Sequence, residues 1–408
     1  MTPPDDRRLD PDQPLAGPPD PWTETDMPPH RDGPPWHMTE MIEAEPALAE
    51  RLLTRLADPA SAAAELAEQL RATAHRRASI VVTGCGTSEH GAMAAAEILR
   101  DAMRDAGLPW RLGEGGAPVA AQAFEASLEE ELGAGGLVIG ISHEGATWAT
   151  NRALERARSS GAAVGLVTVS DRSPAAKLAD VVVATGELDR SWCHTIGYLV
   201  PILAATAVGA HLSGRSIDPR VVRATLAGGL GSDAVSATER LAAALADLDR
   251  IVVIGSGADR VAARELALKL EEGTHLPATA RDLETLLHGH LAGMDDRTGV
   301  VLIAADAGQA DARRARAAGA LRAAAEIGCV IGAIAGPEYR DGLGADLVVP
   351  PEVETSALPH AAGALFTTAV PLQLLTERTA RVRGVNPDPI RRDDPAYLRA
   401  AEAPSATG

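Results

Sequence analysis

The stretch Ile80-Val81-Val82-Thr83-Gly84-Cys85-Gly86-Thr87-Ser88 predicts a buried strand that runs into a glycine turn and then into a helix. Residues 80–82 are apolar and β-branched without alternation, as in a parallel strand covered on both faces. The turn is small and polar, and a helix is expected over residues 89–100. Its backbone N–H groups and the positive end of the helix dipole suit an anion, most simply a phosphate. An ordinary strand-to-helix turn without a ligand is the alternative.

Two well-known glycine loops do not fit this turn. A dinucleotide-binding fingerprint would place its third glycine at position 89, where the chain has Glu89, and no Gly-Lys-Ser or Gly-Lys-Thr triplet forms a P-loop. We therefore expect no nucleotide pocket, and no cofactor is predicted.

Composition narrows the class of protein. The 408 residues suffice for two domains, and a formal net charge of -18 disfavours nucleic acid or an anionic membrane as partner, because both require a basic surface. No apolar run predicts a signal peptide or a membrane span. The three cysteines are scattered without metal-ligand spacing, as in a reducing compartment, so we expect a cytoplasmic protein: Cys85, Cys193 and Cys329.

Short apolar strands alternate with helices, and this alternation occurs twice. Further strands are expected over residues 136–142, 163–169 and 180–184, then over 250–257, 299–305, 329–334 and 346–349, with helices over 147–160 and 198–212. The alternation favours parallel sheets with helices on both faces. We predict an α/β fold of two similar three-layer domains, residues 37–235 and 236–383.

Both ends of the chain are expected to lie outside these cores. Residues 1–36 are rich in Pro and Asp and are predicted to be a disordered leader, because they cannot bury enough apolar surface. From Met38 onward the pattern indicates helical segments, with Pro46 near a helix start. Residues 384–408 are predicted to be an extended C-terminal segment lying on a surface.

Three motifs give the chain a resemblance to a known family. They are the turn over residues 85–88 (CGTS), a second turn over 142–147 (SHEGAT), and the pair of segments 267–272 (ALKLEE) and 287–292 (LHGHLA). Over residues 38–400 the chain resembles the sugar isomerase (SIS) domain family, specifically its tandem-domain members such as the isomerase half of glutamine–fructose-6-phosphate aminotransferase. The resemblance implies tandem SIS domains.

The resemblance also implies roles for single residues. Glu272 falls where the family has the glutamate that moves a proton between C1 and C2, Lys269 where a lysine lies near it, and His288 where a histidine opens the sugar ring. A carboxylate in a dry pocket and a histidine suit these two proton transfers. The expected substrate-binding residues lie in the two turns and in the loop of residues 189–195: Gly86, Thr87, Ser88, Ser142, His143, Glu144, Thr147, His194 and Thr195.

Other interpretations of these residues stay open. Glu265, Lys269 and Glu272 share one helix face, which is also how a solvated salt-bridge stripe looks. His288 and His290 could form a metal pair, since alternate residues of a strand face one way, and His275 and Asp295 could join them. No diagnostic spacing supports this, so no metal is predicted.

The chain departs from the family pattern in three places. Position 2 is Thr2, where the aminotransferase has its glutaminase cysteine, so glutamine hydrolysis by that route is not expected. Glu144 replaces a serine that contacts phosphate, and a carboxylate beside a phosphate is repulsive unless it is protonated or turned away; an acid that only complements a helix dipole is the alternative. The family's imine-forming lysine falls on Ala400, beside Arg399, so imine chemistry is in doubt.

These implications favour an enzyme that isomerises or deaminates a sugar phosphate or amino-sugar phosphate, without glutamine hydrolysis. A small-molecule sugar phosphate and a second copy of the chain, in a homodimer, are the expected partners. A non-catalytic sugar-phosphate sensor and a deglycase of a glycated amine phosphate are the alternatives, the last because it would give Glu144 a cationic partner.

Overall fold

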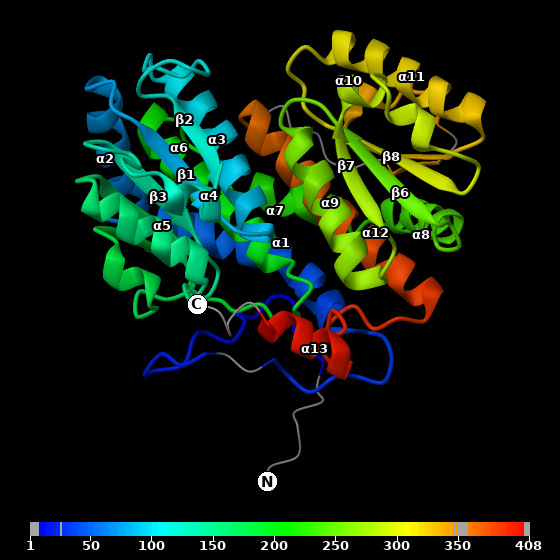
Figure 1. Cartoon of the computed structure of the whole chain (residues 1–408), viewed down its shortest axis with the longest axis horizontal. Coiled ribbons are helices and arrows are strands. Elements are labelled where there is room, and N and C mark those ends of the chain that lie inside the picture. Colours follow the sequence, from blue (N-terminus) through cyan, green and yellow to red (C-terminus); the bar gives the residue numbers. More distant parts are fainter. Residues whose placement is uncertain (1–7, 25–26, 346, 350–357, 404–408) are drawn as a thin grey trace.

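Two five-stranded parallel sheets frame the protein in this computed structural model, which describes residues 8–24, 27–345, 347–349 and 358–403 (Figure 1). The first sheet has the order β2-β1-β3-β4-β5 and the second β10-β9-β8-β6-β7. Each sheet therefore has its first strand beside its second and third, and the second sheet repeats the topology of the first. The predicted α/β fold with parallel sheets is confirmed.

The strands follow the apolar runs of the sequence. Those of the first sheet are β1 (Ile80–Gly84), β2 (Pro118–Gln122), β3 (Leu137–Ile141), β4 (Ala163–Thr168) and β5 (Val181–Ala184). Those of the second are β6 (Arg250–Gly255), β7 (Ala278–Asp282), β8 (Thr298–Ala304), β9 (Val330–Ala335) and β10 (Leu347–Val349). Two edge strands, β2 and β7, were not predicted, because the apolar residues of β2 are mostly Pro and Ala, which are depleted in strands, and β7 contains Thr, Arg and Asp. Residue 346 of the last predicted strand lies outside the described residues.

Helices cover both faces of each sheet. The first half contains α1 (His37–Leu56), α2 (Ala62–His75), α3 (Thr87–Asp105), α4 (Ala123–Leu128), α5 (Trp148–Ser159), η1 (Ala175–Leu178), α6 (Ile196–Ser213) and α7 (Pro219–Gly228). The second contains α8 (Ser232–Leu245), α9 (Asp259–Thr274), α10 (Leu283–Leu286), η2 (His290–Gly293), α11 (Ala310–Ile327), η3 (Pro337–Tyr339), α12 (His360–Arg383) and α13 (Pro395–Glu402).

One continuous core joins the two sheets. Successive side chains of a strand point to opposite faces, so Ile80 and Val82 enter this shared core while Val81 packs with α5 on the outer face. The second sheet is built in the same way: Ile251 and Val253 face inward, and Val252 faces α11. Helices α9 and α12 lie between the sheets in Figure 1. The boundary at residue 236 stays a prediction, since helices of both halves share this core.

The leader differs from the prediction. Its described residues carry no helix or strand, yet Leu15 is buried, and the backbone N–H of Leu15 donates to Glu187 and that of Leu188 to the carbonyl of Ala16. Arg8 also pairs with Glu43 of α1. Low apolar content alone led to the prediction of disorder for this segment. Its described residues instead make polar contacts with residues far away in sequence.

Two further expectations about the ends were wrong. Pro46 lies inside α1 and not near its start. The C-terminal segment is not wholly extended, because it contains α13, where the Asp394 side chain accepts the backbone N–H of Ala396 at 2.8 Å.

Helix α6 is the apolar segment that closes the first half. Among the helices of the described residues, α6 alone has the length and apolar composition needed to cross a membrane, and 83% of it is buried inside the protein. It packs against α3, α2 and α1, so its apolar side chains are buried in the core.

Candidate functional site

A cleft of about 280 Å³ opens where strands of the first sheet end, between that sheet, α9 and the C-terminal segment. Parallel strands commonly bind ligands at this edge. The cleft is lined by Cys85, Gly86, Thr87, Ser88, His143, Glu144, Ala146, Thr147, Trp192, His194, Gly197, Glu272, Ile390 and Arg392. It thus brings together Glu272 and seven of the nine predicted substrate-binding residues; Ser142 and Thr195 are buried behind it.

The first turn carries the start of α3 into the cleft. Gly86 is the residue before the helix and has φ +57°, a conformation that favours glycine. The Thr87 hydroxyl is used inside the protein, since it donates to Glu265 Oε1 at 3.3 Å and accepts from Lys269 Nζ at 3.1 Å. Ser88 and the backbone at the helix start therefore remain for a ligand, where the dipole favours an anion.

The second turn connects β3 to α5. Gly145 has φ +72°, and a Cβ there would lie 2.3 Å from Ser173 Oγ, so the chain path requires glycine. Thr147 is the residue before α5 and lines the cleft, while the buried Ser142 hydroxyl lies 3.5 Å from that of Thr147. The two helix starts, of α3 and α5, thus face one cleft.

Lys269 joins two carboxylates of α9 below the first turn. Its Nζ lies 2.6 Å from Glu272 Oε2 and 3.4 Å from Glu265 Oε1. The side chains of Lys269 and Glu265 are 0% exposed, and that of Glu272 is 21% exposed toward the cleft. His90 Nδ1 completes the group at 2.7 Å from Glu265 Oε2. The solvated-stripe interpretation is therefore wrong for this helix face.

Charge fixes the protonation state of this lysine. Burial would lower the pKa of Lys269, but the carboxylates of Glu272 and Glu265 outweigh it and raise the pKa. Burial would likewise raise the pKa of Glu265, and Lys269 and His90 lower it instead. Lys269 is thus a permanent ammonium partner of Glu272 and not the neutral amine that an imine requires.

Two histidines form another wall. The rings of His143 and His194 lie 5.5 Å apart, and His143 Nε2 accepts the backbone N–H of Asp189 at 3.1 Å. Burial and the neighbouring His194 lower the pKa of His143 to about 4. Neutral His143 is therefore a structural acceptor at the rim of the cleft.

A glutamate and an arginine face the same cleft. Burial raises the pKa of Glu144, and within the described residues no Lys, Arg or His lies at ion-pair distance from its carboxylate. The guanidinium of Arg392 stacks on Trp192, with Cζ 3.8 Å from the ring centre, and no carboxylate of the described chain pairs with it. A cation that sequence reasoning missed therefore reaches the cleft from the C-terminal segment.

The backbone around Arg392 is anchored and bent. Asp388 accepts the first two N–H groups of α1, from His37 at 2.9 Å and Met38 at 2.8 Å, and its carbonyl accepts the N–H of Trp192 at 3.0 Å. Ile390 and the next residue both have positive φ, which is rare for a β-branched side chain. Such strain in a fixed segment is common at functional sites.

His288 does not reach this chain's cleft. Its side chain is 71% exposed beyond the end of α10 and pairs with Glu284 at 2.9 Å. It does not lie on a strand with His290, because His290 begins η2 and receives a hydrogen bond from Arg281 at 3.4 Å. The pairing proposed for a metal is therefore wrong in its geometry, and the described residues contain no cluster of metal-ligating side chains.

The equivalent edge of the second sheet holds a cleft of about 230 Å³, and backbone N–H groups at this edge are already bonded by carboxylates of the protein. Asp259 Oδ2 accepts the N–H groups of Ala305 and Asp306 at 2.9 Å each, and Asp306 Oδ2 accepts that of Ala258 and pairs with Arg313 at 2.7 Å. These carboxylates occupy the N–H groups that would otherwise bind an anion. Glu272 lines the cleft of the first sheet and not this one, so the first cleft is the candidate site.

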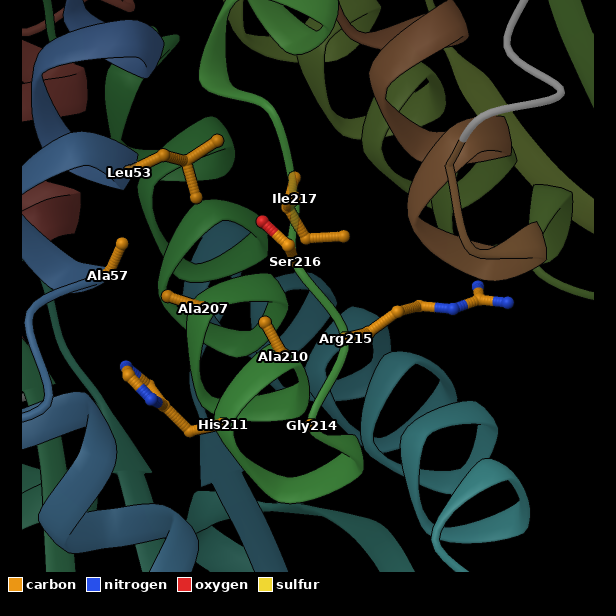
Figure 2. Close-up of a pocket in the computed structure, with 9 residues that line it drawn as sticks. All are labelled: Leu53, Ala57, Ala207, Ala210, His211, Gly214, Arg215, Ser216 and Ile217. Atoms are coloured by element: carbon orange, nitrogen blue, oxygen red, sulfur yellow. The ribbon is translucent and has the colours of Figure 1, made fainter.

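Another cavity, of about 330 Å³, lies at the end of α6 and has a mixed polar and apolar lining (Figure 2). His211 Nε2 already bonds the carbonyl of Leu56 at 2.8 Å, and Arg215 points away from Ala207 and Ala210 in Figure 2. No charged group is directed into it, so its chemistry is poorer than that of the cleft at Glu272.

Two parallel sheets of the same topology, with a cluster of one ammonium and two carboxylates at the edge of the first, fit two tandem SIS domains. Residues 244–328 match the SIS domain model, and a solved structure with a similar fold covers 88% of the chain. The predicted resemblance is confirmed.

The chain is also similar to individual proteins. The chain is 29% identical to glutamine–fructose-6-phosphate aminotransferase of Symbiobacterium thermophilum over 65% of its own length and 44% of the relative's. It therefore spans less than half of the curated relatives it matches. Among solved structures it is similar to the C-terminal domain of glucosamine-fructose-6-phosphate aminotransferase from Francisella tularensis (TM-score 0.72, 20% identity, 88% and 99% covered). It is also similar to tagatose-6-phosphate ketose/aldose isomerase from Escherichia coli (TM-score 0.70, 18% identity, 90% and 98% covered).

Proposed function

We propose that the protein interconverts the aldose and ketose forms of a sugar phosphate or amino-sugar phosphate, with Glu272 as the base. The observation that carries this proposal is that Glu272 and the start of α3 line one cleft. A proton-transfer carboxylate and an anion-binding helix start are the two parts that this chemistry requires.

Glu272 is held for the proton transfer by Lys269. The ammonium binds Oε2 at 2.6 Å, which orients the carboxylate and leaves Oε1 as the candidate base. Oε1 takes the proton from the carbon next to the carbonyl, and the electron pair moves onto the carbonyl oxygen to give an enediolate. The proton of the adjacent hydroxyl passes to this oxygen, and Glu272 returns its proton to the former carbonyl carbon as the new carbonyl forms. In an amino sugar the same shift lets water release ammonia from C2 or C1, which is the deaminase direction.

Arg392 supports the anionic end of the substrate. With the helix starts at Gly86 and Thr147 and the Ser88 hydroxyl, it supplies the donors that a phosphate needs in a chain of strongly negative charge. Homodimer formation, as the resemblance implies, stays a proposal.

Glu144 favours a second candidate, a deglycase that acts on a glycated amine phosphate. This carboxylate lines the cleft without a cationic partner in the described residues, and an amine-bearing ligand would supply one. The two candidates share the base Glu272 and differ in the leaving group.

The test is to incubate the purified protein with fructose 6-phosphate and with glucosamine 6-phosphate, with and without ammonium, and then with a fructosamine 6-phosphate. NMR in D2O follows both sugars, free amine or ammonia and deuterium at C1 and C2. Glu272→Gln should abolish turnover, and Glu271→Gln, the same change outside the cleft, should keep it. Saturable binding without turnover by the native protein would favour a sensor and refute the enzyme.

A further inference from the structure

A buried aspartate stands behind one wall of the cleft. The Asp189 side chain is 0% exposed, and its carboxylate is fixed by three backbone N–H groups: those of Ser191 at 3.2 Å, Thr195 at 2.8 Å and Gly197 at 3.2 Å. A carboxylate that accepts three such bonds keeps its charge and its position. Burial would raise the pKa of Asp189, but the neighbouring histidines and these N–H groups lower it to about 2.

His194 lies between this aspartate and the cleft. Its Nδ1 atom is buried and lies 3.6 Å from Asp189 Oδ2. This distance suits an ion pair and is too long for a hydrogen bond. The ring is 25% exposed and lines the cleft that Glu272 lines. Nε2 is therefore the nitrogen available to a ligand, while Nδ1 is directed at a fixed negative charge.

The groups around His194 favour its charged form. Burial and Lys269 disfavour the imidazolium, Asp189 and Glu272 favour it, and the net effect is a pKa raised above the ordinary histidine value. His143 faces it as a neutral ring, because its own Nε2 accepts an N–H, and Glu144 adds negative charge on the same wall. Of the two histidines, only His194 can give a proton near neutral pH.

We propose that His194 is the catalytic acid and base that opens the sugar ring, with Asp189 as its positioning residue. This inference rests on the proposed function and assigns a step that the resemblance had given to His288. His288 of the same chain is 71% exposed and tied to Glu284, whereas His194 and Glu272 line one cleft.

The step balances within one histidine. The imidazolium at Nε2 gives its proton to the ring oxygen as the bond between that oxygen and the anomeric carbon breaks, and the electron pair of this bond stays on the oxygen. The anomeric hydroxyl then gives its proton to the neutral Nε2 as the carbonyl double bond forms. His194 ends protonated as it began, and Asp189 stabilises the charged form at both ends of the step.

The experiment isolates ring opening from isomerisation. In a Glu272→Gln background no proton moves between C1 and C2, but a working ring-opening group still exchanges the anomers of fructose 6-phosphate. Anomer exchange is measured by NMR magnetisation transfer at catalytic protein concentration. Adding His194→Gln should slow the protein-catalysed exchange by about 100-fold or more, as expected for loss of a general acid–base. Adding His288→Asn in its place should leave exchange at the level of the background.

Three results would overturn the inference: no catalysed anomer exchange in the Glu272→Gln background, exchange unaffected by His194→Gln, or loss with His288→Asn alone. Catalysed exchange together with no isomerisation, deamination or deglycation by the native protein would instead refute the proposed function and leave the role of His194 standing. The two failures are therefore distinguishable.

Asp189→Asn adds a readout that needs no turnover and keeps the native His194. The change removes the negative charge, so the pKa of His194 measured by ¹⁵N NMR should fall, and the alkaline limb of the anomer-exchange profile should move to lower pH by the same amount. An unchanged His194 pKa in a folded Asp189→Asn protein would refute the positioning role. Far-ultraviolet circular dichroism verifies that each variant is folded.

Discussion

Replacing Lys269 by methionine should destabilise the protein by about 3 kcal/mol, near the low end of the cost of removing one partner from a buried ion pair. This free-energy loss follows from the solvent exposure of the two carboxylates that lose their cation. Glu272 is 21% exposed and can regain water, whereas Glu265 is 0% exposed and keeps His90, at 2.7 Å, and the Thr87 hydroxyl, at 3.3 Å. One buried charge and not two is therefore left poorly compensated.

The stability deficit of Lys269→Met should change with pH, and the pKa shifts of Glu265 and Lys269 determine in which direction. The lowered pKa of Glu265 contributes stability above its unfolded value of about 4.3, and this is lost as pH falls through the folded pKa. The raised pKa of Lys269 contributes stability below its unfolded value of about 10.4, and this is lost as pH rises through the folded pKa. At neutral pH both contributions are present. In Lys269→Met, burial raises the pKa of Glu265, so the deficit should shrink as pH falls from 7 toward 5.

The measurement is urea denaturation followed by circular dichroism and tryptophan fluorescence at pH 5, 6 and 7, with coincident transitions as the condition for a two-state fit. Arg152→Met is the matched control. It breaks a surface pair with Glu155 at 2.8 Å whose side chains are 57% and 47% exposed, and should cost at most about 0.5 kcal/mol. A Lys269→Met deficit below about 1 kcal/mol, or one that grows toward pH 5, would refute the reasoning.

Three further predictions concern the cleft. Arg392→Ala should raise the Kd for fructose 6-phosphate, measured by calorimetry, about 10- to 100-fold, as expected for the loss of one charge-assisted contact. Arg392→Lys should recover only part of the affinity, because an ammonium cannot stack flat on Trp192. An unchanged Kd would contradict the proposal that Arg392 binds the anion. Glu144→Gln should tighten the same ligand, and the gain should grow as pH rises through the raised pKa of Glu144, so a constant Kd ratio from pH 5 to 8 contradicts the repulsion. Gly145→Ala should lower the free energy of unfolding by about 1–3 kcal/mol. The control Gly161→Ala should cost less, because Gly161 has a similar φ of +75° but open space around it. Equal melting temperatures for the two variants would show that the contact with the Ser173 hydroxyl is relieved at no cost.

Most of the sheet framework was predictable because buried parallel strands are continuous apolar runs. The unpredicted strands β2 and β7 are edge strands with alanine, glutamine and arginine, and they pair through the backbone of β1 and β6. Backbone pairing leaves no side-chain signal. Only the repeat itself could have indicated them, since each follows the helix after the first strand of its sheet.

The candidate site was predictable where residues of one segment act together. The turn at Gly86 and the helix face of Glu272 were both found, and the structure brings them to one cleft. Arg392 and Asp189 were missed as site residues because their roles depend on distant partners, Trp192 and His194. His288 shows the converse: a matching motif places a residue type in sequence, and in the folded chain its side chain is 71% exposed beyond the end of α10, so its role stays a prediction.

The cap that Asp388 provides to α1 has a consequence for how the protein is made. Its carboxylate reaches backbone N–H groups 351 and 350 residues earlier in the chain, and the same segment delivers Arg392 to the cleft. Contacts of such long range form late, because a large loop must close first. During synthesis from the N-terminus, the sheets and Glu272 can be in place while the cleft still lacks its arginine. A ribosome-bound or truncated chain that ends before residue 388 should therefore be folded in its sheets and bind fructose 6-phosphate more weakly than the full chain.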